Sequence, residues 1–166
     1  VSIITKLTRD ENEITWVKNN IEYLLVGTAP LSKQIYLDCL NKFNIACLES
    51  YGMTEALILS SNTKTHNLPQ TVGRPLANVR VKFKKSKATN GRELFIKTDS
   101  FFEEYYNELE NFKKSDSNWF PTGDLGNITD DGYIKITGRS KDLIIRGGIN
   151  ISPRQIEECI SELKFI

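Results

Sequence analysis

Residues 21–55 read IEYLLVGTAPLSKQIYLDCLNKFNIACLESYGMTE, a segment in which two apolar runs flank a stretch with helical spacing. The first run, residues 21–28, is closed by a glycine and is typical of a buried parallel strand. The second run, residues 45–50, reads as another short buried strand. Between them Pro30 favours a helix start, and the apolar residues near helical spacing are Leu31, Ile35, Leu37, Leu40 and Phe43. The segment therefore predicts a βαβ unit with two parallel strands.

Two glycine-marked segments follow these strands, one at Gly27 and one at YGMTE, residues 51–55. Ligands bind beyond the carboxyl ends of parallel strands, so both segments are expected at a ligand-binding edge. A glycine, a hydroxyl and a carboxylate are costly to place between apolar runs unless something binds them. From these five residues alone, two interpretations stay open: the rim of a polar pocket, or a strand-ending turn capped by Thr54 and Glu55.

The pattern changes after Pro69. In some short runs apolar and polar residues alternate, other short runs are apolar, and Gly, Asn and Asp separate them. These runs predict an antiparallel β region and cover residues 79–85, 93–98, 133–137 and 143–148. Helical spacing returns over residues 152–165, and Ser152 followed by Pro153 is a plausible helix start.

The composition excludes several classes of function. The 166 residues include 22 Lys and Arg and 21 Asp and Glu, so the formal net charge of +1 argues against nucleic acid or an acidic membrane as a partner. No stretch approaches the roughly 18 apolar residues of a membrane span, and the N-terminus lacks a signal-peptide pattern. The three cysteines, Cys39, Cys47 and Cys159, lack metal-ligand spacing and are expected to be buried in a reducing compartment. We therefore expect a cytoplasmic protein.

Five stretches need a common explanation, although each is weak by itself. They are GTAPL (27–31), YGMTE (51–55), VGRPL (72–76), WFPTGDLG (119–126) and GRSKDLIIRGGINISPRQIEE (138–158). In this order and spacing they resemble the adenylate-forming (AMP-binding) enzyme superfamily: acyl- and aryl-CoA synthetases, luciferase and the adenylation domains of peptide synthetases. The last stretch looks most like the acyl- and aryl-acid CoA ligases. The resemblance spans residues 20–162, which is nearly the whole chain.

The resemblance implies an α/β fold. Residues 1–137 would be the C-terminal part of the large N-terminal domain, with a βαβ layer and a small antiparallel β-barrel-like region. Residues 138–166 would begin the small, mobile α+β C-terminal domain. The implied activity is activation of a small-molecule carboxylic acid with ATP to an acyl-adenylate, followed by transfer to a thiol. The implied cofactors are ATP or AMP, Mg²⁺ and coenzyme A as co-substrate. An amino-acid adenylation segment that loads a carrier protein, and an inactive truncated remnant, are the alternatives.

Several residues would then bind the nucleotide. Gly27, Ala29 and Pro30 match the family positions that line the pocket for adenine and the acyl substrate, and their small side chains and bent backbone suit a flat slot. Tyr51 would stack on the ligand, which is worth on the order of 1 kcal/mol, and Gly52 would let the backbone approach the ligand closely.

The resemblance also implies roles in chemistry. Thr54 would donate its hydroxyl to the α-phosphate, and Glu55 would hold Mg²⁺ through its carboxylate. Asp124 would accept hydrogen bonds from the ribose hydroxyls, and Arg139 would be a second contact to ribose or phosphate. Lys141 matches the hinge about which the small domain swivels, although by itself it reads as a solvated lysine.

The remaining matches concern the thiol and the β region. Gly147 and Gly148 resemble the loop that lines the pantetheine tunnel, with Gly148 as the contact residue. In VGRPL, Arg74 is expected to be structural, and Gly73 with Pro75 to shape the link into the β region.

Two parts of the family pattern are missing from this sequence. They are the upstream Ser/Thr/Gly-rich phosphate loop and the C-terminal catalytic lysine, for which Lys164 is not a credible substitute. The chain therefore looks like a fragment of a larger enzyme, with an exposed sheet edge and an exposed apolar face. We expect the isolated chain to catalyse little or no adenylation.

Overall fold

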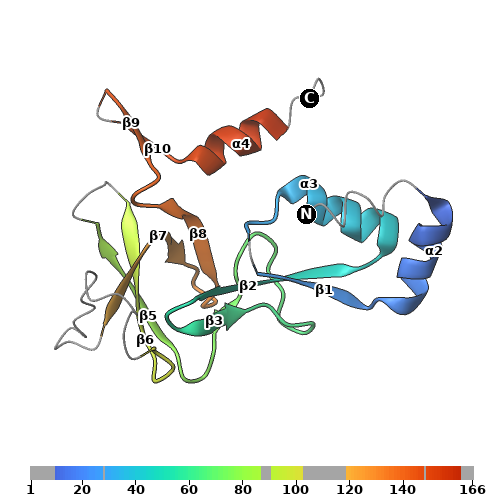
Figure 1. Cartoon of the computed structure of the whole chain (residues 1–166), viewed down its shortest axis with the longest axis horizontal. Helices are drawn as coiled ribbons and strands as arrows, with labels where there is room; N and C mark the ends of the chain where they lie inside the picture. Colours follow the sequence, from blue (N-terminus) through green and yellow to red (C-terminus); the bar gives the residue numbers. More distant parts are fainter. Residues whose placement is uncertain (1–9, 28, 87–90, 103–118, 148, 162–166) are drawn as a thin grey trace.

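Figure 1 shows the computed structural model of the chain, which describes residues 10–27, 29–86, 91–102, 119–147 and 149–161. In chain order the elements are α2 (Glu11–Asn20), β1 (Tyr23–Val26), α3 (Lys33–Asp38), η1 (Cys39–Phe43), β2 (Ala46–Met53), β3 (Leu57–Ser61), β4 (Arg74–Pro75), β5 (Arg80–Lys85), β6 (Arg92–Lys97), β7 (Phe120–Ile128), β8 (Ile134–Arg139), β9 (Ile144–Arg146), β10 (Ile149–Ile151) and α4 (Pro153–Ser161).

The βαβ unit predicted from residues 21–50 is confirmed. β1 pairs with β2 in parallel, in the register that runs from Tyr23 opposite Ala46 to Val26 opposite Glu49. The helix begins after Ser32, whose Oγ accepts from the Ile35 N–H at 3.2 Å. It continues into the π-helical turn η1. The helical layer and the sheet share one core cluster, made of Val17, Leu31, Cys39, Phe43, Ile45 and Cys47.

Helix α2 was not predicted from the sequence. Its ten residues, ENEITWVKNN, contain few apolar side chains, and Val17 is the one that the structure buries. The helix is fixed locally at its start, because a carboxylate oxygen of Asp10 accepts from the Asn12 N–H at 2.8 Å. Local capping, rather than an apolar stripe, is therefore the feature that marks this helix.

The antiparallel region forms a four-stranded sheet in the order β5-β6-β7-β8, as the alternating runs predict. Its inner face packs on residues from the β2–β3 hairpin and the loop before β5, which joins the two sheets. This second core cluster contains Ala56, Leu59, Val79, Phe83, Leu94, Ile96 and Ile134. Strand β7 was not predicted, because Pro121, Gly123 and Gly126 interrupt the apolar alternation.

The C-terminal elements are the β9–β10 hairpin and α4, which lie beside β8 in Figure 1. The expected helix over 152–165 is confirmed for Pro153–Ser161, and the residues after 161 lie outside the described part of the chain. Two hydrogen bonds attach the start of α4 to β8. Ser152 Oγ donates to the Thr137 carbonyl at 3.0 Å, and Arg154 Nη1 donates to the Ile136 carbonyl at 2.9 Å. The boundary expected between residues 137 and 138 falls inside β8 and stays a prediction.

The link from the loop into the β region depends on Gly73 and Arg74. Gly73 has a φ of 80°, and its carbonyl accepts from the Ile134 N–H at 2.9 Å, so it connects this segment to β8. The Arg74 guanidinium lies over the Tyr133 ring, 4.7 Å from the ring centre. Both contacts support the structural role expected for this segment.

The surface of the described residues includes large apolar side chains. On the parallel sheet and its hairpin, Leu25 is 68% exposed and Leu57 is 70% exposed, in line with the expected apolar face. Cys39 and Cys47 are buried as predicted, whereas Cys159 is exposed and the prediction for it was wrong. It lies on α4 near Ile156 and Ile160, which are also exposed. Among the described residues, no helix has the length and hydropathy needed to cross a membrane.

Candidate functional site

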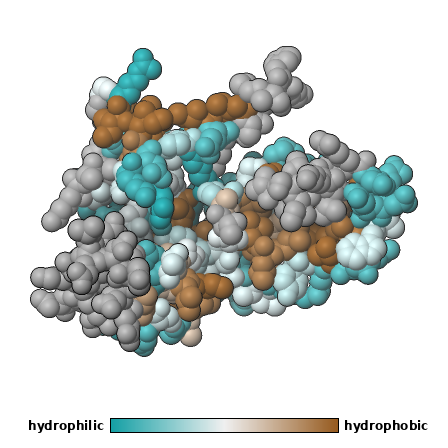
Figure 2. Space-filling view, viewed as in Figure 1, coloured by the Kyte–Doolittle hydropathy of each residue, from teal (hydrophilic) through white to brown (hydrophobic). Residues whose placement is uncertain are grey.

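A cavity of about 420 Å³ lies where the carboxyl end of the parallel sheet faces β7, β8 and the first residues of α4. In Figure 2 the surface is hollowed between the C-terminal elements and the parallel sheet. The βαβ unit supplies one wall and the antiparallel sheet supplies the other. Segments far apart in the sequence therefore share one cleft, at the sheet edge where a ligand was expected.

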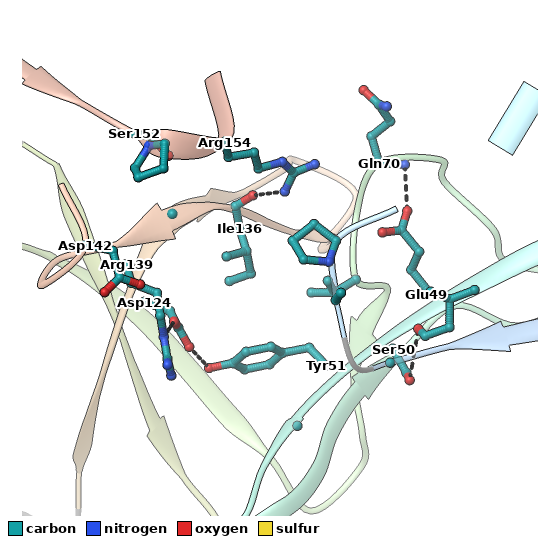
Figure 3. Close-up of a pocket in the computed structure, with 18 residues that line it drawn as sticks. Glu49, Ser50, Tyr51, Gln70, Asp124, Ile136, Arg139, Asp142, Ser152 and Arg154 are labelled. Atoms are coloured by element: carbon teal, nitrogen blue, oxygen red, sulfur yellow. Dashed lines mark hydrogen bonds and ion pairs between the residues drawn. The ribbon is translucent and has the colours of Figure 1, made fainter. Parts of the chain in front are cut away.

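The antiparallel register places the two charged groups of one wall directly opposite each other. Asp124 on β7 pairs with Arg139 on β8, and Arg139 Nε donates to Asp124 Oδ1 at 2.8 Å. From the other wall, the Tyr51 hydroxyl on β2 donates to Asp124 Oδ2 (Figure 3). Asp124 is 5% exposed, so its carboxylate is a buried acceptor that joins three strands. A carboxylate offers about four lone-pair sites, so it keeps capacity for ligand hydroxyls.

The protonation states of this cluster follow from burial and from Asp124. Burial, and then the neighbouring Asp124 carboxylate, raise the pKa of Tyr51 far above its ordinary value. The hydrogen bond from Arg139 to Asp124 raises the pKa of the Arg139 guanidinium. At neutral pH, Tyr51 is therefore a neutral donor and Arg139 is a cation.

The opposite wall contains a second buried carboxylate. Glu49 on β2 is 6% exposed and accepts from two backbone N–H groups, those of Leu31 at 3.3 Å and Gln70 at 3.2 Å. Burial raises the pKa of Glu49, while the two backbone hydrogen bonds and the charge of Arg154 act in the opposite direction.

Seven of the eleven site residues named from the sequence line this cavity. They are Gly27, Ala29, Pro30, Tyr51, Gly52, Asp124 and Arg139. Lys141 lies in an exposed turn after β8, outside the cavity lining. Gly148 lies outside the described residues. The structure thus brings together the residues expected to hold adenine and ribose.

The residues expected to act on phosphate and metal do not line the cavity. Thr54 and Glu55 lie in the turn between β2 and β3, where the Glu55 carbonyl accepts from the Phe102 N–H at 2.8 Å. Within the described residues, no group of three or more His, Cys, Asp or Glu side chains is placed to hold a metal ion. The roles of Thr54 and Glu55 stay predictions.

Gly52 was expected in a loop after the strand, where its backbone would approach the ligand closely. The structure differs from this expectation. Gly52 lies inside β2 rather than in a loop after the strand, at a bulge between Tyr51 and Gly52. A Cβ placed on Gly52 would lie 2.4 Å from the Leu57 carbonyl oxygen. The close backbone approach that requires a glycine here is therefore to β3.

The sequence reasoning did not name six polar or charged residues of the cavity as site residues. These are Glu49, Ser50, Gln70, Asp142, Ser152 and Arg154. For Glu49 a signal was present, because a carboxylate inside the apolar strand IACLES is rarely buried without partners. Gln70 and Arg154 come from a loop and a helix start whose packing against the cavity only the tertiary structure shows.

Comparison with protein families identifies a match over most of the chain. A model described as AMP-binding enzyme matches residues 2–106, well over half of the 166 residues. In sequence, the chain is similar to the 2-succinylbenzoate–CoA ligase of Staphylococcus aureus strain MSSA476. The two are 37% identical over 141 residues, which make up 83% of this chain and 28% of that ligase.

Solved structures show the same likeness. ATP-bound MatB from Rhodopseudomonas palustris is 28% identical, with a TM-score of 0.76 over 98% of this chain and 37% of that one. The anthranilate CoA ligase AuaEII, in complex with anthranoyl-AMP, shares the fold at 18% identity, with a TM-score of 0.76 over 98% of this chain and 36% of that one. The chain thus spans roughly a third of the length of these relatives.

Proposed function

The chain belongs to the AMP-binding enzyme family, and from this membership we propose that it forms the nucleotide-binding part of an acid–thiol ligase. The resemblance predicted from the five sequence stretches is confirmed at the level of the family. The proposed reaction activates a carboxylic acid with ATP to an acyl-adenylate and transfers the acyl group to coenzyme A. The observation that carries the proposal is the cavity in which Tyr51, Asp124 and Arg139 meet.

The residues of the cavity suit an adenine nucleoside. The Asp124 carboxylate accepts from the two ribose hydroxyls, and Arg139 fixes the orientation of that carboxylate through the Nε hydrogen bond at 2.8 Å. The Tyr51 ring offers a flat face for the base, held in place by the bond from its hydroxyl to Asp124. On the other wall, Ala29 and Pro30 leave room for a planar ring.

The proposed chemistry has two steps. In the first, a carboxylate oxygen of the acid attacks the α-phosphorus of ATP, and the bond to pyrophosphate breaks. In the second, a thiolate attacks the acyl carbon, and AMP leaves. The contribution of this chain is to hold the adenosine so that the α-phosphate is presented in a fixed orientation to the acid.

Magnesium is not assigned to the cavity. Mg²⁺ is usually held by one or two carboxylates together with substrate phosphates. Glu55, the residue expected to bind it, lies outside the cavity lining. The binding of Mg²⁺ by Glu55 stays a prediction.

Coenzyme A is proposed as the thiol, rather than a carrier protein, because similar proteins are CoA ligases. Two of the similar proteins are CoA ligases, one for 2-succinylbenzoate and one for anthranilate. Both acids are small molecules, so a small carboxylic acid is the proposed substrate class. Loading of a carrier protein and a cytoplasmic location remain predictions from the sequence.

A chimera tests the proposed activity. The stretch of the Staphylococcus aureus ligase that matches this chain would be replaced by the corresponding residues of this chain. We expect the chimera to bind ATP and to retain ATP–pyrophosphate exchange that depends on 2-succinylbenzoate, whereas the isolated chain shows little or none. A folded chimera that binds ATP but shows no acid-dependent exchange would contradict the proposed activity.

A further inference from the structure

Glu49 is a charged side chain at the centre of the cavity wall. It lies near the carboxyl end of β2, opposite Val26 of β1, and is 6% exposed. Its carbonyl accepts from the Asn62 N–H at 2.9 Å and from Asn62 Nδ2 at 3.2 Å, so its main chain is fixed to the start of the following loop. A buried carboxylate in a strand with a fixed backbone has little freedom to turn towards solvent.

The Glu49 carboxylate joins two separate loops of the cavity. Oε2 accepts from the Leu31 N–H, 18 residues earlier in the chain, at the end of the segment that contains Ala29 and Pro30. Oε1 accepts from the Gln70 N–H, 21 residues later, which is the bond drawn in Figure 3. Both loops line the cavity, so one side chain sets the distance between them.

The loop around Gln70 depends on such support. Gln70 has a φ of 63°, a left-handed conformation that residues other than glycine seldom adopt. The buried Asn62 side chain holds the same loop, with Nδ2 donating to the Thr71 carbonyl at 2.7 Å and Oδ1 accepting from the Leu68 N–H at 3.0 Å. Through its bonds to Gln70 and Leu31, the Glu49 carboxylate connects this loop to the opposite loop.

The two partners of Glu49 are both donors, and this sets the chemistry that the position requires. An ionised carboxylate has two acceptor oxygens and satisfies both N–H groups. A glutamine has one acceptor oxygen, and its NH₂ group would face the second N–H as donor against donor. A protonated carboxyl group is also a poorer partner, because the oxygen that carries the hydrogen is a weaker acceptor.

We propose that Glu49 is a positioning residue of the nucleotide cavity, whose ionised carboxylate holds the Leu31 and Gln70 loops at the separation that the nucleotide needs. This inference rests on the proposed nucleotide-binding function. Among the described residues, the titratable groups that interact electrostatically with Glu49 include Tyr36 on α3, Cys47 on β2 and Arg154 on α4. The pKa of Tyr36 and that of Cys47 are raised, so both are neutral at neutral pH, and Arg154 is the facing cation.

The positioning role gives a pH dependence of defined sign. Burial raises the pKa of Glu49 above its ordinary value of 4.5. As the pH falls through the raised pKa, Glu49 gains a proton, the N–H of one loop is left with a weaker acceptor, and ligand affinity falls. The contribution of Glu49 to folding has the opposite sign: it is fully present below the ordinary pKa and is lost as the pH rises through the raised pKa. Towards acid pH, a positioning role therefore lowers ligand affinity, whereas the contribution of Glu49 to the stability of the fold increases. Measuring both quantities distinguishes positioning from a merely structural role.

The test measures the affinity of the full chain for AMP and for adenosine by calorimetry between pH 5 and 8. Adenosine is included because it has no titrating phosphate. Glu49→Gln is expected to weaken both ligands about tenfold at neutral pH and to remove the acid-side decline in affinity. Glu93→Gln is the matched control, because Glu93 accepts one backbone N–H, that of Gly123, and an amide oxygen can replace that bond.

A second readout needs no ligand. Hydrogen exchange of the Leu31 and Gln70 amides is expected to be faster in Glu49→Gln than in the parent and unchanged in Glu93→Gln. Parent-like AMP affinity, pH profile and amide exchange in Glu49→Gln would overturn the positioning role while leaving the proposed function intact. A parent chain that binds neither AMP nor adenosine would overturn the proposed function, and the positioning role with it.

Discussion

Asp124→Ala is expected to weaken AMP binding by the chain at least about tenfold, because hydrogen bonds to a charged group are worth roughly 1.5–3 kcal/mol each. The substitution removes the acceptor for the ribose hydroxyls. It also removes the carboxylate that fixes Tyr51 and Arg139, both of which donate to it in the structure. Calorimetric titration of AMP into the parent chain and the variant measures the loss.

Asp131→Ala is the control for this experiment. Asp131 is an exposed carboxylate in the turn after β7, outside the cavity lining, so its loss changes the net charge by the same amount. AMP affinity in this variant is expected to equal that of the parent. If Asp124→Ala and the parent bound AMP with equal affinity, Asp124 would not belong to the nucleotide site.

Gly73→Ala is expected to lower the free energy of unfolding by about 3 kcal/mol or more, the range that severe backbone and overpacking changes reach. A Cβ on Gly73 would lie 1.9 Å from the Ser61 carbonyl carbon, at a φ of 80°. The backbone cannot move aside easily, since the Val72 N–H and the Gly73 carbonyl both bond to Ile134 on β8, at 2.8 and 2.9 Å. Urea unfolding of the parent and of Gly73→Ala measures the difference in the free energy of unfolding.

Gly132→Ala separates the steric clash from the strain of the conformation. Gly132 has a φ of 83°, nearly that of Gly73, but within the described part of the chain its added Cβ meets no atom within 4 Å besides those of Gly132 and its two chain neighbours. Its substitution is expected to lower the free energy of unfolding by about 1–2 kcal/mol, because a residue with a side chain is strained in the left-handed conformation. Equal losses in the two variants would show that crowding against Ser61 does not matter.

Apolar periodicity predicted several of the elements that supply the core clusters. The parallel pair β1 and β2 and the helix between them follow from residues 21–50, since their apolar side chains recur with the period of each element. Helix α2 and strand β7 were not predicted by this reasoning. A capping carboxylate at Asp10 sets the first, and Pro121 breaks the alternation of the second.

Seven of the eleven site residues named from family matches line the cavity, whereas their relative placement depends on strand pairing. Asp124 and Arg139 were named from their stretches, yet the register that sets them face to face is a property of β7 and β8 together. Glu49 was missed because its partners, Leu31 and Gln70, are backbone groups on loops far apart in the chain. The carboxylate inside an apolar strand signals that Glu49 has partners, but no side-chain pattern identifies which backbone groups they are.

A crystal structure of the chain with AMP tests the central claim most directly. We expect the nucleotide in the cavity of about 420 Å³, with its ribose hydroxyls on the Asp124 carboxylate and its base against the Tyr51 ring. AMP bound at another surface, with Tyr51, Asp124 and Arg139 unchanged and the cavity filled only by solvent, would contradict the account.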